Sequence, residues 1–418
     1  MAPPDGFRRA DPDHGRGRPA RGGTRSGPTP GCGAGACVTA GAATEPAAGR
    51  VALVTGAAGQ DGFYLVERLL REGSAVHATV REISRATDLT SLPGGERLTI
   101  HELDLIDADA VADLVASVRP AELFNLAGQT SVGVSYREPG ETWQTNATAV
   151  ATLLEAVRRS SPETMLYQSS SIEMFGGDSG AELVHDERSA LRPMSPYAAS
   201  KAAAHVLCDA YRRAFDLRIA CGILANHESR RRPASFLTRK VVDYVRALRE
   251  GRAGGQADVG PLPVGNLAVR RDWGFAPDFV EGIIRVCRQV SVRAEVAGGQ
   301  PEPDIGSSYR DYVLATGELH AVWELIDRAF ELAGLPLAWD RSSADLADWS
   351  ARIAATGRLA VAVDPALLRP GEPAALGADP SRARTDLGWQ ARGGLDAFLE
   401  DMLEPELANA APGSITTA

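Results

Sequence analysis

The chain has 418 residues, 44% of them hydrophobic, which is enough for two compact domains or for one large α/β domain with an extension. Its formal net charge of −10 argues against nucleic acid as a partner, because a phosphate backbone binds basic surfaces. No apolar run reaches the roughly 18 to 20 residues that cross a bilayer, and the polar start does not resemble a signal peptide. We therefore expect a cytoplasmic protein with no membrane partner.

The two ends of the chain differ from its middle. Residues 1–49 are rich in Gly, Pro, Ala and Arg and have almost no large apolar side chains, which predicts a disordered tail. A basic anchoring arm is the alternative for this segment. Cys32 and Cys37 lie in it without a second Cys/His pair nearby, so no metal site is expected. Residues 405–418 are expected to form a flexible C-terminus.

A buried strand at residues 51–54 begins the fold, and a glycine-rich turn leads into a helix over residues 63–71. Further strands are predicted at residues 75–80, 98–103, 122–127, 164–169 and 218–224, with helices between them. This alternation predicts an α/β fold with a parallel, doubly wound sheet of the Rossmann type over residues 50–225. The segments of residues 226–404 are less periodic, so we expect a smaller substrate-binding lobe with elements that return to the sheet.

The turn after the first strand has the spacing Gly56-x-x-Gly59-x-x-Gly62. Glycines at this spacing permit a tight turn and let the backbone approach a pyrophosphate at a helix N-terminus. Because the pattern follows a strand and opens a helix, it predicts a dinucleotide site that includes Gln60 and Asp61.

The end of the second strand indicates which dinucleotide binds. Arg81 and Arg85 favour the 2′-phosphate of NADP, whereas Glu82 favours the free hydroxyl of NAD, so NADP is preferred and NAD stays open. The other expected cofactor residues follow later strands: Asp104 and Leu105 at the adenine, and Leu126, Ala127 and Gln129 at the nicotinamide ribose.

Tyr197 and Lys201 lie one helical turn apart in a predicted helix. A tyrosine hydroxyl has an ordinary pKa of about 10, and a neighbouring ammonium favours its phenolate. Tyr197 could then take a proton from a sugar hydroxyl while the carbon gives hydride to the cofactor, and Lys201 could hold the ribose hydroxyls. The alternative is a Tyr and a Lys on an exposed helix face, which the dinucleotide fold makes less favoured.

The end of the fifth predicted strand carries Ser171 and Glu173. The carboxyl edge of a parallel sheet is where such folds bind ligands. A hydroxyl at Ser171 can bind the oxygen of the oxidised carbon. A simple reductase needs Ser, Tyr and Lys, so the carboxylate of Glu173 suggests a further proton transfer next to a new ketone. A helix cap or a surface carboxylate is the alternative for Glu173.

Together these residues resemble the GDP-mannose 4,6-dehydratase family of the extended short-chain dehydrogenase/reductase superfamily, from about Val51 to about Met402. The stretches that carry the resemblance are Gly59-Gln60-Asp61-Gly62, Asn125-Leu126-Ala127-Gly128-Gln129, Ser195-Pro196-Tyr197, Gly222 to Ser229, Thr238-Arg239-Lys240, Gly265-Asn266-Leu267, Arg271-Asp272-Trp273-Gly274 and Arg369-Pro370-Gly371-Glu372.

The resemblance implies a lyase that converts a GDP-hexose, GDP-mannose, to a GDP-4-keto-6-deoxyhexose by internal hydride transfer through NADP. It assigns the C4 proton to Tyr197 with Lys201, the C5 proton to Glu173, and the C4 oxygen to Ser171. It also implies a homodimer or homotetramer. By the same matching, the cofactor would contact His227 and Arg232, and the nucleotide sugar would contact Asn226, Lys240, Gly265, Asn266, Arg271, Arg369 and Glu372.

The sequence departs from the family pattern at several places. Glu82 stands where a second arginine is common, Ser131 where a histidine is usual, Glu141 where a tyrosine is usual, and Arg230 replaces a proline. The hydride machinery is kept while the sugar pocket differs. A GDP-sugar 4-reductase or epimerase, or a 4,6-dehydratase of another nucleotide sugar, therefore stays open, as does a non-catalytic dinucleotide sensor.

Overall fold

The computed structural model describes residues 49–177, 184–249, 251, 260–296, 310–369 and 372–404, and for residues 289–296 only the helical backbone. The predictions for residues 1–48 and 405–418 lie outside this range. The chain divides after Glu45 into two units, and every described residue belongs to the second. Within the described residues, no helix combines the length and the hydropathy that crossing a bilayer requires.

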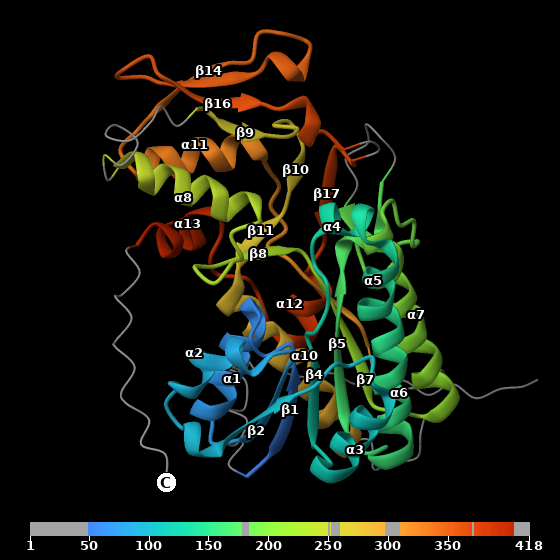
Figure 1. Cartoon of the computed structure of the whole chain (residues 1–418). Helices are drawn as coiled ribbons and strands as arrows, with labels where there is room; N and C mark the ends of the chain where they lie inside the picture. The colour runs from blue at the N-terminus through green and yellow to red at the C-terminus, as the bar shows by residue number, and fades with distance from the viewer. Residues whose placement is uncertain are drawn as a thin grey trace, which may run out of the picture. The chain divides into compact units, whose positions relative to one another are not determined.

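A seven-stranded sheet contains six strands from residues 51–224 and a seventh from residues 312–314 (Figure 1). All neighbouring strands are parallel, which confirms the predicted doubly wound sheet. Its strands, in spatial order, are β12 (Tyr312–Leu314), β7 (Ile219–Leu224), β5 (Met165–Ser171), β4 (Glu122–Asn125), β1 (Val51–Thr55), β2 (Ala75–Val80) and β3 (Leu98–Glu102). Every residue of β4 and β5 is buried, as expected for central strands covered on both faces.

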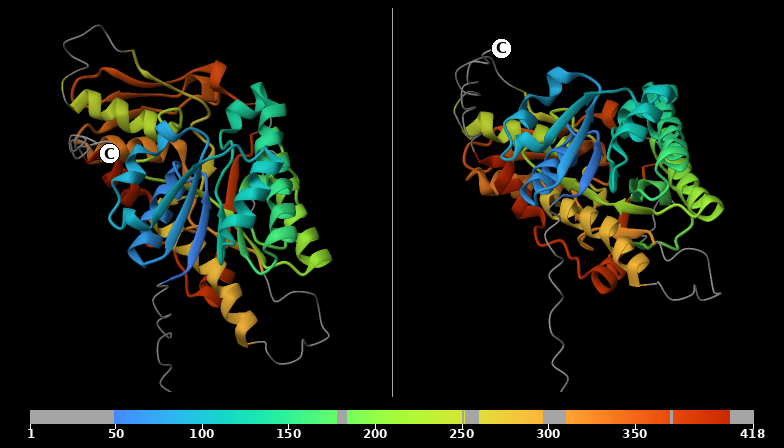
Figure 2. Two further views of the ribbon diagram at one scale, coloured as in Figure 1. Left: turned by 60° about the horizontal axis from the view of Figure 1, so that its bottom comes forward. Right: turned by 90° about the horizontal axis from the view of Figure 1, so that it is seen from below.

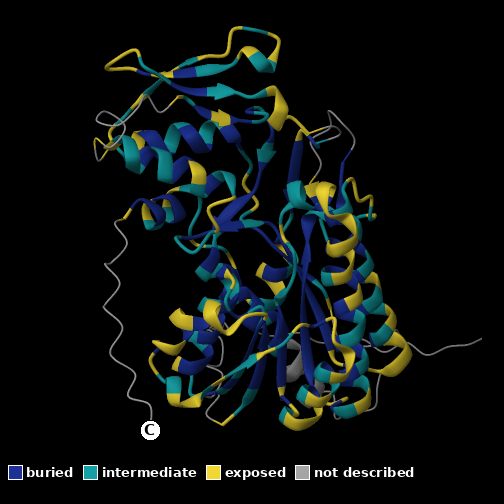
Figure 3. Cartoon of the chain, viewed as in Figure 1, coloured by how far each residue is buried: buried dark blue, intermediate teal, exposed yellow. Residues whose placement is uncertain are grey.

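Helices cover both faces of this sheet (Figure 2). Successive strand residues point to opposite faces, so Phe124 packs in one core and Leu123 in the other. The face of Phe124 is covered by α1 (Gln60–Arg71) and α10 (Ala276–Val296). The opposite face is covered by α3 (Ala108–Val118), α6 (Ala149–Ser160) and α7 (Pro196–Phe215). The buried colour of the sheet between exposed helix faces in Figure 3 shows the same layering.

A second core lies around a four-stranded sheet with the order β14 (Leu337–Asp340), β15 (Ser350–Ile353), β16 (Leu359–Val363) and β9 (Leu262–Val264). The helices α8 (Leu237–Arg249), α11 (Val322–Leu332) and α13 (Leu395–Leu403) contribute to it. The sequence predicted irregular segments here, whereas the structure has long helices. In α8, charged residues separate the apolar ones along the sequence, but Val241 and Val245 lie one turn apart and are buried on the same face of the helix.

Short strands bring distant segments to the carboxyl end of β5. One parallel pair is β8 (Asn226–Glu228) with β11 (Trp273–Phe275). The other small sheet has the order β13 (His320–Ala321), β10 (Arg270–Arg271), β17 (Ala375–Ala378) and β6 (Val184–His185). The remaining short helices are α2 (Thr87–Thr90), α4 (Val132–Arg137), α5 (Pro139–Trp143) and α12 (Ser381–Leu387), with a π-helical turn at Gln144–Thr148.

Asp272 fixes the connection between β10 and β11. Its carboxylate is fully buried and accepts hydrogen bonds from the Thr316 amide (3.0 Å), the Thr316 hydroxyl (2.8 Å) and the Gly317 amide (2.8 Å). Buried donors that lose their acceptor carry a desolvation cost.

We therefore expect Asp272→Ala to lower the free energy of unfolding by roughly 2–4 kcal/mol, measured by urea denaturation. The exposed Asp345, which accepts from the Ala347 amide at 2.9 Å, provides the control. Asp345→Ala should cost about 1 kcal/mol or less. Equal losses in the two variants would contradict this role for Asp272.

Candidate active site

Two adjoining cavities open at the carboxyl ends of the parallel strands. The first, of about 400 Å³, is lined by the glycine-rich turn and by the ends of β2, β3 and β4. The second, of about 320 Å³, is lined by the ends of β5 and β7, the start of α7 and segments of the second core. Four residues line both cavities: Asp61, Leu126, Thr130 and Arg232. The two cavities are therefore neighbours, so that a ligand in one can contact a ligand in the other.

The structure brings most of the expected cofactor residues to the first cavity. Arg81 and Arg85 also line it, whereas Glu82 is exposed and does not. The expected residues that line it are Gly56, Gly59, Gln60, Asp61, Gly62, Arg81, Asp104, Leu105, Leu126, Ala127, Gln129 and Arg232.

The glycine-rich turn fits a dinucleotide. Gly56 has φ +67°, and a Cβ atom there would lie 2.8 Å from the Ala127 backbone. A Cβ atom on Gly62 would lie 2.3 Å from the Gly56 carbonyl oxygen, so the turn closes only with glycine at both positions. Gly59 is the N-cap of α1 and has no side chain that could cap the helix. The first backbone amides of α1 are therefore available to a phosphate.

Tyr197 and Lys201 enter the second cavity from the first two turns of α7, and both are buried. Ser195 caps this helix by accepting from the Ala198 amide at 3.1 Å, and Pro196 occupies its first position. The Lys201 ammonium donates to the Ser169 carbonyl at 3.0 Å. Burial lowers the pKa of Lys201 to about 8, while the Asp61 carboxylate acts against this shift.

The environment of Tyr197 differs from the sequence expectation. Burial raises the pKa of Tyr197 to about 12, a hydrogen bond with Ser171 lowers it, and the charge of Glu173 raises it. Arg232 is the cation that lowers this pKa, but desolvation outweighs it, so the phenolate is not favoured in this state.

Ser171 and Glu173 lie beside Tyr197 at the end of β5. The Ser171 hydroxyl accepts from the Glu173 amide at 3.3 Å. Burial raises the pKa of Glu173, Arg271 lowers it, Glu372 raises it and Arg369 lowers it. A carboxyl group whose pKa is raised in this way is a better proton acceptor than an ordinary carboxylate, and it can release the proton again. The structure thus places all four expected catalytic residues in one cavity.

The start of α1 is joined to β8 by side-chain contacts. Gln60 Nε2 donates to the His227 carbonyl at 2.9 Å, and the Ser229 hydroxyl donates to Gln60 Oε1 at 2.9 Å. His227 Nε2 lies 2.9 Å from Asp61 Oδ2, and its ring stacks on Phe279 with 4.5 Å between centroids. Burial disfavours the imidazolium, but the Asp61 carboxylate outweighs it and raises the pKa of His227. His227 lines the second cavity.

The expected substrate residues divide into two groups. Asn226, Arg271, Arg369 and Glu372 line the second cavity, where Glu372 Oε1 lies 3.4 Å from Arg271 Nη2 and 3.7 Å from Arg369 Nη1. Lys240, Gly265 and Asn266 line neither cavity; Lys240 is exposed on α8, and Asn266 Oδ1 accepts from the Ala268 amide at 2.9 Å.

Sequence reasoning missed other residues that line the second cavity. Tyr136 on α4 bonds the Met194 carbonyl through its hydroxyl at 3.2 Å, and both residues line the cavity. Phe236 lines it as well. These residues lie in short helices and loops, where no periodic pattern marks a side chain as inward-facing.

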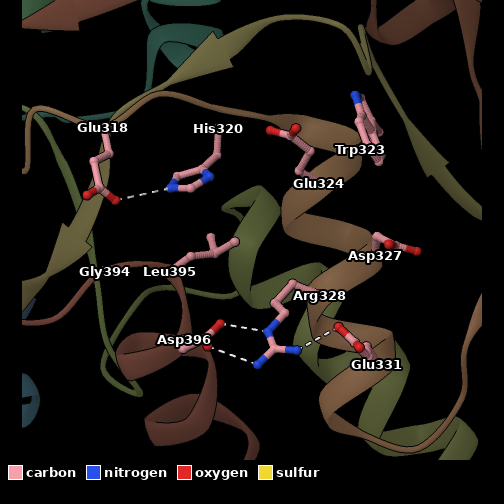
Figure 4. Close-up of a pocket in the computed structure, with 10 residues that line it drawn as sticks. All are labelled: Glu318, His320, Trp323, Glu324, Asp327, Arg328, Glu331, Gly394, Leu395 and Asp396. Carbon is pink, nitrogen blue, oxygen red and sulfur yellow. Dashed lines mark hydrogen bonds and ion pairs between the residues drawn. The ribbon is translucent and has the colours of Figure 1, made fainter.

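A third pocket, of about 560 Å³, lies between α11 and α13 (Figure 4). Its charged groups bind one another, because Arg328 bonds Asp396 at 2.7 and 2.9 Å and Glu331 at 2.6 Å. Asp327 accepts from the Trp339 indole at 2.8 Å. Because these charged side chains already have partners, the pocket is a weaker candidate for a ligand site than the two cavities at the sheet edge.

One group of potential metal ligands lies within the described residues, formed by His205, Cys221 and Asp311, whose ligand atoms lie within 4.8 Å of one another. Asp311 Oδ1 accepts from Arg212 Nη2 at 2.7 Å and from the Cys221 amide at 2.9 Å. Because a guanidinium already balances the carboxylate, we assign this group as a buried ion-pair cluster.

The Asp61–His227 contact gives a measurable prediction. Asp61→Asn removes the counter-charge while His227 stays buried, so the pKa of His227 should fall. Titration of the histidine ring signals by NMR checks this, with His320 in the pocket of Figure 4 as the internal control. An unchanged His227 titration would contradict the assignment.

Comparison with known proteins agrees with this geometry. The family model described as GDP-mannose 4,6 dehydratase matches residues 53–402. GDP-mannose 4,6 dehydratase 2 of Arabidopsis thaliana is 35% identical over 370 residues, covering 86% of this chain and 87% of that protein. GDP-mannose 4,6 dehydratase of Dictyostelium discoideum is 32% identical over 369 residues, covering 86% and 96%.

Solved structures show the same fold at lower identity. DesIV, a dTDP-glucose 4,6-dehydratase from Streptomyces venezuelae determined with NAD, has a TM-score of 0.64 at 22% identity and covers 84% of this chain and 95% of its own. UDP-glucuronic acid 4-epimerase from Bacillus cereus has a TM-score of 0.64 at 20% identity, covering 84% and 98%. From the family match and the identity to these relatives, this chain belongs to the GDP-mannose 4,6-dehydratase family.

Proposed function

We propose that this protein is a hydro-lyase that converts GDP-mannose to GDP-4-keto-6-deoxymannose with a nicotinamide dinucleotide, NADP, held in the first cavity. The observation that carries the proposal is the position of Glu173 beside Ser171, Tyr197 and Lys201 in the second cavity. A 4-reductase of the same fold has no C5 proton to remove, and so no use for this carboxyl group.

Each of these side chains has a distinct task in the proposed reaction. Bound nicotinamide supplies storage for the hydride between its loss at C4 and its return at C6. Ser171 binds the C4 oxygen, and Tyr197 takes the proton of the C4 hydroxyl. Lys201, one helical turn from Tyr197, supplies the positive charge that stabilises the phenolate as it forms.

Glu173 performs the elimination. Its carboxylate takes the C5 proton, which the C4 ketone makes acidic, and the C6–O bond breaks as water leaves. Because burial raises its pKa, the protonated form of Glu173 can deliver that proton to the departing C6 hydroxyl. One carboxyl group thereby moves the proton from C5 to the leaving oxygen. When the hydride returns to C6, C5 takes up a proton again, and the proton that Tyr197 took from the C4 hydroxyl balances this step.

The nucleotide diphosphate is proposed to bind at Arg271 and Arg369. Both line the second cavity, and guanidinium groups suit the paired oxygens of a diphosphate. Asn226 supports the same assignment from β8. Lys240, Gly265 and Asn266 stay proposals from the resemblance, without support from either cavity. A homodimer or homotetramer is also proposed, since closed symmetric oligomers are the common assemblies.

The central test replaces the carboxyl group of Glu173. Wild-type protein incubated with GDP-mannose and NADP should form a product lighter by one water, detected by mass spectrometry. Glu173→Gln should lower this rate by roughly 10²- to 10⁴-fold and leave NADP affinity unchanged, since Glu173 does not line the first cavity. Full turnover in Glu173→Gln would contradict the assignment, and a product that keeps its water would favour a reductase or an epimerase.

NADP is proposed over NAD because Arg81 and Arg85 line the first cavity and Glu82 does not. Arg85→Ala should weaken NADP binding by roughly 10-fold or more and leave NAD binding nearly unchanged. Glu82→Gln serves as the neighbouring control and should change neither affinity appreciably. Isothermal titration with both dinucleotides measures the effect, and equal losses for NADP and NAD would contradict the preference.

A further inference from the structure

Residues 229–236 connect β8 to α8 and run along both cavities. This segment has the sequence Ser-Arg-Arg-Arg-Pro-Ala-Ser-Phe. Three of its residues line the first cavity and three line the second, with Arg232 in both sets. The position of this segment therefore affects both the dinucleotide and the sugar site.

Two of the three arginines fasten the segment close to the cavities. Arg232 Nε lies 2.9 Å from Glu228 Oε2, and its guanidinium lies over the Phe236 ring. Arg231 Nη2 donates to Asp88 at 2.7 Å, and its guanidinium lies 3.4 Å from the centroid of the Phe63 ring.

Arg230 reaches away from the cavities to α13. Its amide donates to Asp401 Oδ2 at 2.7 Å, and its Nε donates to Asp401 Oδ1 at 2.7 Å. The Asp401 carboxylate thus binds both the backbone and the side chain of one residue, with 15% of its side chain exposed. Charge-assisted bonds of this kind are stronger than neutral ones. Asp401 itself lines neither cavity.

Asp401 belongs to a well-packed element. Its neighbours on α13, Phe398, Leu399 and Met402, are buried in the core that α8 and α11 also share. A carboxylate on such a helix can hold a loop in place because the helix cannot easily follow the loop.

We propose that Asp401 is a positioning residue for the cofactor, which acts through Arg230 to hold residues 229–236 along the two cavities. The inference rests on the proposed function, in which the hydride taken from C4 returns to C6 of the same sugar. A cofactor that serves both steps must stay bound between them, so a fixed segment beside it keeps the cycle from being interrupted.

The test compares two aspartates of the same helix. Asp401→Asn removes the carboxylate closest to Arg230, while Glu404 Oε2 stays 3.1 Å from Arg230 Nη2. Asp396→Asn removes the charge from a similarly close bidentate pair with Arg328, which lies in the pocket of Figure 4. The dissociation rate of NADPH from each protein is measured by stopped-flow fluorescence, and thermal unfolding is recorded for both.

Asp401→Asn is expected to raise the dissociation rate of NADPH by about 3- to 10-fold, with kcat at saturating NADP within about 2-fold of wild type. Asp401→Glu should restore much of the retention. Asp396→Asn should lose similar thermal stability and keep the wild-type dissociation rate. Arg230→Ala repeats the measurement from the other side of the contact, in case Asp401→Asn does not fold.

Wild-type dissociation rates in both Asp401→Asn and Arg230→Ala would overturn the inference, as would equal acceleration in Asp396→Asn. Failure of wild-type protein to bind any dinucleotide would overturn it as well. If wild-type protein binds NADPH but forms no dehydrated product, the proposed function fails while faster release from Asp401→Asn still upholds the role of Asp401.

Discussion

The contacts between the start of α1 and β8 are the interaction on which the candidate site depends. Gln60, in the turn that would hold the pyrophosphate, bonds both the His227 carbonyl and the Ser229 hydroxyl, and Asp61 pairs with the His227 ring. These bonds place the segment after β7 against the glycine-rich turn, so the two cavities share a wall. A nicotinamide bound in one cavity is then adjacent to a sugar bound in the other.

The electrostatics of the second cavity follow from burial more than from any single neighbour. Burial raises the pKa of Tyr197 and of Glu173 and lowers that of Lys201. All three shifts favour the uncharged forms, which is the state of least cost for groups removed from water. A bound substrate adds the negative charge of its diphosphate and excludes solvent, and both effects change the three pKa values. Proton transfer among Tyr197, Glu173 and Lys201 is therefore coupled to substrate binding.

The sequence predicted the sheet and the chemistry at its edge for physical reasons. The strands β1 and β7 are mostly apolar, as buried parallel strands are, and the Tyr197–Lys201 spacing matches one helical turn. Other features could not be predicted from the sequence. The raised pKa of Tyr197 depends on how deeply α7 packs, and Arg230 meets Asp401 across 171 residues of sequence. Contacts of that separation arise from the three-dimensional packing alone.

The seventh strand of the sheet has a consequence for synthesis. β12 pairs with β7 but comes almost a hundred residues later, from Tyr312–Leu314. Until that part of the chain leaves the ribosome, β7 presents an open edge that other polypeptides can join. The glycine-rich turn and most of the first cavity are made long before this edge closes, and Glu372 is made later still. A dinucleotide bound to the nascent chain would stabilise the strands already folded before Glu372, which lines the second cavity, has been made.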